Sequence, residues 1–132
     1  MTGSNVQPAA PAAPQAAATH TVTLTLASGL TVHVAHRQDV DGEAIVIEAP
    51  QGSGGFHPTW AATCAAHLVN GAAGTFKDHS DPLDPASITL HPACLTLSVH
   101  GGDVTLHVTP ADRQLLADAI TAVAAATPER VA

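Results

Sequence analysis

Two segments of the chain alternate strictly between aliphatic and polar residues, and each predicts a β-hairpin. In Thr21–Val34, aliphatic residues alternate with threonine or histidine on both sides of Ala27-Ser28-Gly29. In Leu95–Val108, a similar alternation continues on both sides of Gly101-Gly102-Asp103. Because successive side chains of a strand point to opposite faces, a period of two interrupted by a glycine turn indicates two paired strands.

Two further strands are predicted outside the hairpins. Glu43–Ala49 is apolar on both faces, which is typical of a central strand, and Ser87–His91 is a short apolar run. Pro50–His57 is rich in glycine and is predicted to be a loop. The segment 72–86 is polar and carries prolines near its end, so it is also predicted to be a loop.

Two segments have the apolar spacing of amphipathic helices. The first begins at Pro58 and ends at Asn70, just before Gly71, and its buried stripe would comprise Trp60, Cys64, His67, Leu68 and Gly71. The second begins at Thr109-Pro110-Ala111-Asp112, which resembles a capping box, and should end near Thr127-Pro128. Its stripe would comprise Leu115, Leu116, Ala119, Ile120 and Val123.

Together these elements predict a two-layer α+β domain spanning residues 19–127. We expect a mostly antiparallel sheet of about six strands, with the two helices covering its aliphatic face. Residues 1–18 are mainly Ala, Pro and Gln and are predicted to be a disordered arm, and 128–132 a tail.

The opposite face of the predicted sheet is a candidate interaction surface. Its residues are polar but mostly uncharged, which suits packing against another protein surface: Thr23, Thr25, Thr31, His33, Thr96, Ser98, Thr105 and His107. The alternative is that threonine is a good strand former, in which case this face needs no function.

The charge balance argues against two classes of partner. Four basic residues against eleven acidic ones give a formal net charge of −7, which repels phosphate backbones and anionic lipid headgroups. We therefore expect no nucleic acid and no membrane partner. The chain lacks a recognisable secretory signal and a long apolar segment, so a cytoplasmic location is expected.

The two cysteines form the sharpest motif in the chain. Cys64 and His67 are separated by two residues, and so are His91 and Cys94. Thiolate and imidazole are preferred zinc ligands, so these four residues are a candidate zinc site. Helical spacing points the first pair the same way, whereas the second pair requires a turn, which Pro92 favours. The alternative is coincidence in a histidine-rich chain whose cysteines are buried as small apolar residues.

The sequence contains none of the common catalytic motifs, so no enzymatic activity is expected. We predict a small non-catalytic binding or assembly module that acts through self-association or a protein partner, without a cofactor. Richness in Ala, Thr and Pro with a single lysine suggests a high-GC genome, so a phage or viral accessory role, with a virion-associated location, also fits. The alternative is a zinc-binding protein.

Overall fold

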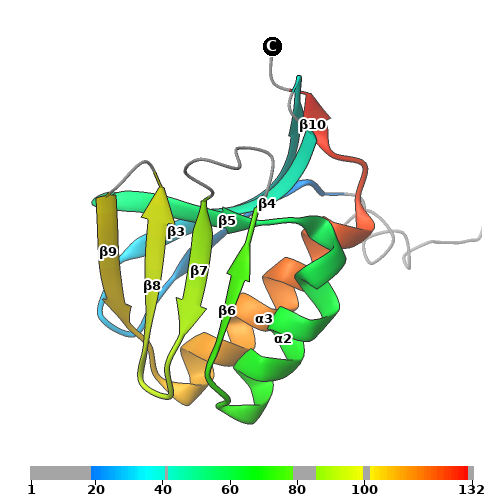
Figure 1. Ribbon diagram of the computed structural model, residues 1–132. Helices are drawn as coiled ribbons and strands as arrows, with labels where there is room; N and C mark the ends of the chain where they lie inside the picture. Colours follow the sequence, from blue (N-terminus) through cyan, green and yellow to red (C-terminus); the bar gives the residue numbers. More distant parts are fainter. Residues whose placement is uncertain (1–18, 41, 79–85, 100–101, 131–132) are drawn as a thin grey trace, which may run out of the picture.

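The computed structural model describes residues 19–40, 42–78, 86–99 and 102–130. Within them the chain forms an α+β fold with two sheets and two helices (Figure 1). The predicted arm at 1–18 and part of the second predicted hairpin turn lie outside the described residues. The α+β class is therefore confirmed, whereas the single sheet of about six strands is replaced by a five-stranded and a four-stranded sheet.

The first sheet is built around β3 (Thr31–Asp39). Its order is β10-β3-β4-β5, where β4 is Gly42–Ala49, β5 is Gly52–Phe56 and β10 is Glu129–Arg130. β2 (Thr21–Thr25) pairs antiparallel with the first half of β3, which confirms the first hairpin. β10, inside the predicted tail, pairs parallel with the second half of β3.

The second sheet contains four antiparallel strands in chain order. These are β6 (Gly74–Lys77), β7 (Ser87–Leu90), β8 (Cys94–Val99) and β9 (Gly102–His107). The pairing of β8 with β9 confirms the second hairpin. β6 lies in a segment that was predicted to be a loop.

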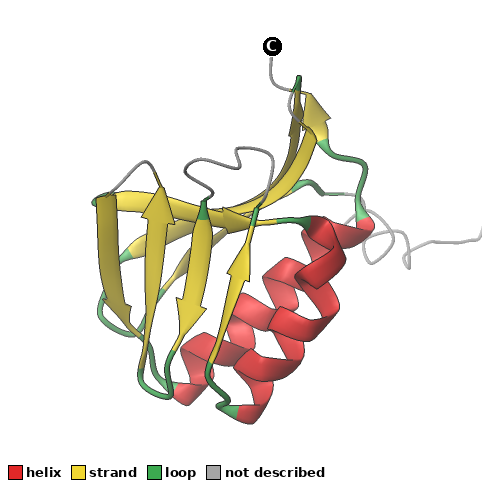
Figure 2. Ribbon diagram, in the orientation of Figure 1, coloured by secondary structure: helices red, strands yellow, loops and turns green. Residues whose placement is uncertain are grey.

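The two helices begin and end close to the predicted residues. A 3₁₀ turn, η1 (Pro58–Trp60), leads into α2 (Ala61–Asn70), and Gly71 ends it with φ of 69°, a conformation that glycine adopts without strain. α3 (Pro110–Ala125) begins with the predicted capping box of Thr109 and Asp112. The helices lie side by side (Figure 2) and close the open side between the two sheets.

β5 corrects the prediction that Pro50–His57 is a loop. It pairs with β4 and also lies across β7 and β8, so it joins the two sheets. A Cβ atom added at Gly54 would lie only 2.9 Å from the Cα of Leu97. Glycine at position 54 is therefore required because two backbones approach closely, and not because the segment turns.

A single core fills the space between the inner sheet faces and the helices. Its largest buried side chains include Phe56, Ile45, Ile47, Leu68, Ile88, Leu90, Leu95, Leu97, Leu116 and Ile120. Trp60 was expected on the buried stripe of the first helix, but it is 43% exposed because the chain there is a 3₁₀ turn and the helix begins one residue later.

Candidate functional site

Cys64 and His67 share helix α2 but have different surroundings. Cys64 is fully buried in the core, and burial raises the pKa of its thiol to about 12, although the charge of Arg113 opposes this shift. The thiol therefore stays protonated, whereas zinc binds the thiolate. His67 is half-buried: its Nδ1 donates to the carbonyl oxygen of Thr63 at 2.8 Å, and its ring packs edge-on against Phe76.

His91 and Cys94 flank the tight turn that joins β7 to β8, and such a turn is what the zinc hypothesis required of this segment. The backbone N–H of His91 donates to the carbonyl oxygen of Cys94 at 2.9 Å, with only two residues between them. Leu95 and Leu97 face the core, so alternation along β8 places the Cys94 side chain on the outer face of the sheet.

The second sheet therefore separates the Cys94 side chain from the core in which Cys64 is buried. In the described residues, no three His, Cys, Asp or Glu side chains come together to hold a metal ion. Cys64, His67, His91 and Cys94 all lie within those residues. The four side chains of the predicted zinc site therefore do not come together as one set of metal ligands, because helix geometry and strand geometry direct its two halves to different places.

Arg113 joins the same two segments through their backbone. This α3 residue is 2% exposed, and its guanidinium donates to five carbonyl oxygens. Nε and Nη2 reach the end of α2 at Leu68 (2.9 Å), His67 (2.9 Å) and Ala72 (3.1 Å). Nη1 reaches the β7–β8 turn at His91 (2.5 Å) and Pro92 (3.4 Å).

Those five contacts use all five N–H donors of a guanidinium. The positive charge also lies at the C-terminus of α2, where the helix dipole favours a cation. The sequence alone gave no sign of this role, because an arginine on a helix is usually exposed. A buried His36 acts similarly at the end of α3, where its Nδ1 lies 3.1 Å from the Val123 oxygen and 3.0 Å from that of Ala126.

The predicted interaction surface falls on two different sheets. Its first half lies on β2 and β3, where all four side chains are exposed and Thr23 Oγ1 lies 2.8 Å from His33 Nδ1. Its second half lies on β8 and β9, where Thr105 and His107 are exposed and Thr96 and Ser98 are half-buried. The hydroxyl-rich face is therefore not one continuous surface of a single sheet.

The outer face of the second sheet carries a ladder of four threonines, one on each strand. The strand register places them directly opposite one another in the order Thr75, Thr89, Thr96 and Thr105. Hydroxyl oxygens lie 3.2 Å apart in the Thr75–Thr89 pair and in the Thr96–Thr105 pair. Sequence reasoning missed Thr75 and Thr89, although Gly74–Lys77 does alternate between polar and apolar residues.

β9 is the last strand in the order of this sheet (Figure 1). The N–H of Val108 donates to the carbonyl oxygen of Ala93 at 3.0 Å, so even-numbered residues of β9 direct their backbone groups toward β8. The backbone groups of Asp103, Thr105 and His107 therefore point away from β8. Among the strands that the structure describes, none pairs with β9 on that side.

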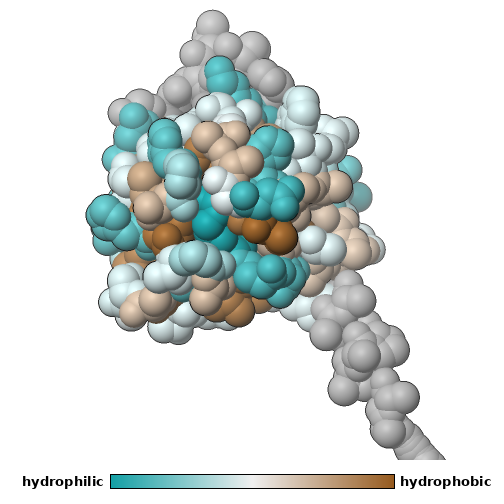
Figure 3. All heavy atoms as spheres, turned by 90° about the horizontal axis from the view of Figure 1, so that it is seen from below, coloured by the Kyte–Doolittle hydropathy of each residue, from teal (hydrophilic) through white to brown (hydrophobic). Residues whose placement is uncertain are grey.

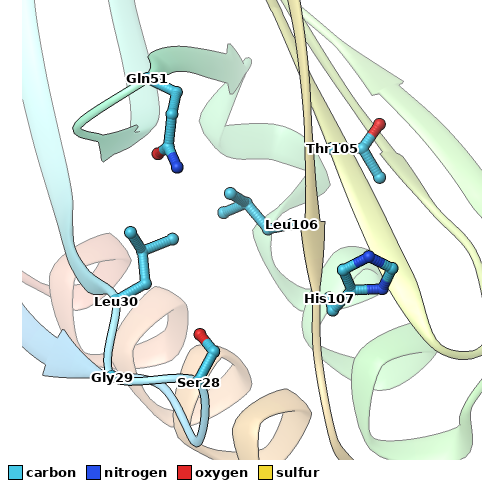
Figure 4. A pocket seen from close by; sticks show the side chains of 7 residues that line it. All are labelled: Ser28, Gly29, Leu30, Gln51, Thr105, Leu106 and His107. Carbon is cyan, nitrogen blue, oxygen red and sulfur yellow. The ribbon is translucent and has the colours of Figure 1, made fainter.

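A hollow of about 390 Å³ lies beside this edge. It is bounded by the β2–β3 turn, the β4–β5 turn and β9, and Leu30, Gln51 and Leu106 point toward one another across it (Figure 4). Thr105 and His107 lie on the other side of β9 in the same view. Asp112 steadies the β2–β3 turn, because its Oδ1 accepts from the N–H of Ala27 at 2.9 Å.

The other surfaces offer less to a ligand. A hollow of about 480 Å³ lies between α2 and α3, but alanine methyl groups line most of it. At the end of the molecule shown in Figure 3, small hydrophobic areas are separated by hydrophilic ones. Of the four basic residues, Arg113 is buried and Arg37 forms an ion pair with Glu48.

No family model, curated protein or solved structure matches this chain. Within the described residues, no helix is long and apolar enough to cross a membrane.

Proposed function

We propose that this protein is a small non-catalytic binding or assembly module that accepts an extended strand at the free edge of β9. The proposal is supported by the outward backbone groups of Asp103, Thr105 and His107, with a hollow directly beside them. In strand addition, backbone hydrogen bonds provide affinity and pockets for alternate side chains provide specificity. Both requirements meet at this edge.

The arrangement of side chains along β9 suits this use. Leu106, Thr105 and His107 all line the hollow, and the side chain of Leu106 lies on the opposite side of β9 from those of Thr105 and His107. An added strand would continue the sheet and place every second side chain over the hollow, beside Leu30 and Leu106. Its remaining side chains would extend the hydroxyl-rich outer face.

A proline substitution tests the proposal with little disturbance of the fold. The N–H of Thr105 points to the free edge, so Thr105→Pro removes no backbone hydrogen bond between β8 and β9. It removes only the hydroxyl contact with Thr96, and it blocks pairing at the edge. Thr23→Pro is the matched control on β2. The N–H of His36 donates to the carbonyl oxygen of His20, and the N–H of Leu26 donates to that of Leu30, so the even-numbered residues of β2 bond to β3. The N–H of Thr23 therefore points away from β3.

The measurements are light scattering over a wide concentration range and affinity capture with the full-length chain. We expect association, with a second copy or with a partner, that Thr105→Pro abolishes and Thr23→Pro retains. Circular dichroism checks that both variants keep the wild-type fold. A chain that neither self-associates nor retains a partner would overturn the proposal, and so would association that survives in Thr105→Pro.

A further inference from the structure

We infer that the strand added at this edge is β9 of a second copy of the chain, paired antiparallel about a two-fold axis at Thr105. This inference rests on the proposed function and specifies its partner and register. A two-fold pairing uses the same surface of both copies, so the edge must be complementary to itself. β9 meets that condition in its backbone and on both of its faces.

The backbone fits because the outward-directed residues meet one another. In this register Thr105 lies opposite Thr105 of the second copy, and Asp103 lies opposite His107. All three residues direct their N–H and C=O groups to the free edge, so each pair can exchange two hydrogen bonds. If the register shifted by one residue, the outward backbone groups of one copy would lie opposite residues of the other copy whose N–H and C=O groups already face β8.

The outer face fits because the ends of the strand carry complementary side chains. Asp103 and His107 are both exposed, and the two-fold axis brings each one opposite the other, twice. An imidazole N–H can donate a hydrogen bond to the carboxylate across the strand pair, whereas like charges in these positions destabilise the pair. A shift of two residues would preserve the backbone ladder but would leave Asp103 without His107 as its counterpart.

The threonine ladder and the inner face fit as well. Thr105 is the last member of the four-threonine ladder. The pairing therefore joins the ladders of the two copies into one ladder that continues from the four-stranded sheet of one copy to that of the other. On the inner face, Val104 of one copy lies opposite Leu106 of the other, beside the hollow that Leu30 and Leu106 line. Two apolar side chains therefore meet where the hollow can accommodate them.

A charge exchange tests the register. His107→Asp places a carboxylate opposite Asp103 at both ends of the interface, and we expect the dimer dissociation constant to rise by about 5-fold or more. Adding Asp103→Lys to that variant places opposite charges across the strand pair, and we expect the dissociation constant to return to the wild-type value or below. Dimerisation that the single change leaves intact, or that the double change fails to restore, overturns the inference.

Site-directed crosslinking tests the two-fold axis directly. Both variants carry Cys94→Ser, and Cys64 is buried with a raised thiol pKa, so it does not compete. Thr105→Cys should form a covalent dimer on oxidation, because paired Cα atoms about 5.5 Å apart lie within the range for a disulfide. Thr75→Cys, at the other end of the same ladder, is the matched control and should give no covalent dimer.

The outcomes separate this inference from the proposed function. If the chain is a monomer at all concentrations and Thr105→Pro abolishes binding of another partner, the inference of a second copy is overturned. The proposal of strand addition at β9 is kept. A dimer that crosslinks through Thr75→Cys and not through Thr105→Cys overturns the inference. Crosslinking through Thr105→Cys together with rescue by charge exchange supports it.

Discussion

Arg113 in α3 donates a hydrogen bond of 2.9 Å from Nη2 to the carbonyl oxygen of His67 at the end of α2. The same guanidinium reaches the carbonyl oxygen of His91 in the β7–β8 turn. The two Cys-and-His segments are therefore held together by a buried cation that binds their backbone. The side chains that suggested zinc do not take part in this contact.

The first prediction concerns the stability that Arg113 provides. Arg113→Lys keeps the charge but supplies three donors instead of five, without the planar fork that spans both segments. A buried carbonyl group that loses its charged hydrogen-bond donor destabilises the folded state. We therefore expect a loss of about 3 kcal/mol in the free energy of unfolding. Urea denaturation measures it, with the exposed Arg130→Lys as control. Equal stability of the two variants would contradict the assigned role.

The second prediction concerns the reactivity of the two thiols. Cys64 is fully buried and its pKa is raised to about 12, whereas Cys94 is half-buried on the outer face. A thiol reagent at mildly alkaline pH should therefore modify Cys94 in the native protein and both cysteines after unfolding. Mass spectrometry of the labelled peptides identifies the sites. Rapid native labelling of Cys64 would show that α2 does not bury it as described.

The third prediction concerns the contact between the two sheets. A Cβ atom at Gly54 would lie 2.9 Å from the Cα of Leu97, a backbone atom that cannot easily move aside. Gly54→Ala should therefore destabilise the fold by about 1–3 kcal/mol or more, as overpacking of a core does. Gly102→Ala is the matched control, because its nearest contact would be an ordinary 3.5 Å from the oxygen of Val99. Thermal melts of both variants give the comparison.

The fourth prediction concerns pH and the ion pair of Arg37 with Glu48. Hydrogen bonds from Arg37 at 2.7 and 3.0 Å lower the pKa of Glu48, so the folded protein binds a proton there less readily than the unfolded chain. The stabilisation is thus fully present above the unfolded pKa of about 4.3 and is lost as the pH falls through the lower folded value.

Glu48→Gln should remove this part of the acid sensitivity. Because the side chains of Arg37 and Glu48 are 31% and 38% exposed, we expect less than about 1 kcal/mol at neutral pH. Denaturation between neutral and acidic pH should show the variant and the wild type converging as the pH falls. Asp118→Asn on the exposed face of α3 makes the same charge change and is the control. A difference that widens in acid would contradict the assignment.

Local patterns in the sequence predicted most of the elements correctly. The alternation around Gly29 predicts the β2–β3 hairpin, and Thr109 with Asp112 predicts the start of α3. These features depend on residues that are close along the chain, where the geometry of a strand or of a helix terminus fixes which side chains share a face. The predicted binding surface and the assembly function stay predictions.

The contacts that define the candidate site could not be predicted in this way. Whether Gly54 belongs to a loop or to a strand depends on the backbone of Leu97, which lies far along the chain. Whether Cys64 meets Cys94 depends on which side of a sheet each one occupies, and Arg113 has its role only because two distant segments end beside it. The sequence by itself therefore determined the strands of both hairpins, the helices and their caps. Only the tertiary structure decided the division into two sheets, the buried arginine and the free edge of β9, because these result from contacts between segments that no local periodicity records.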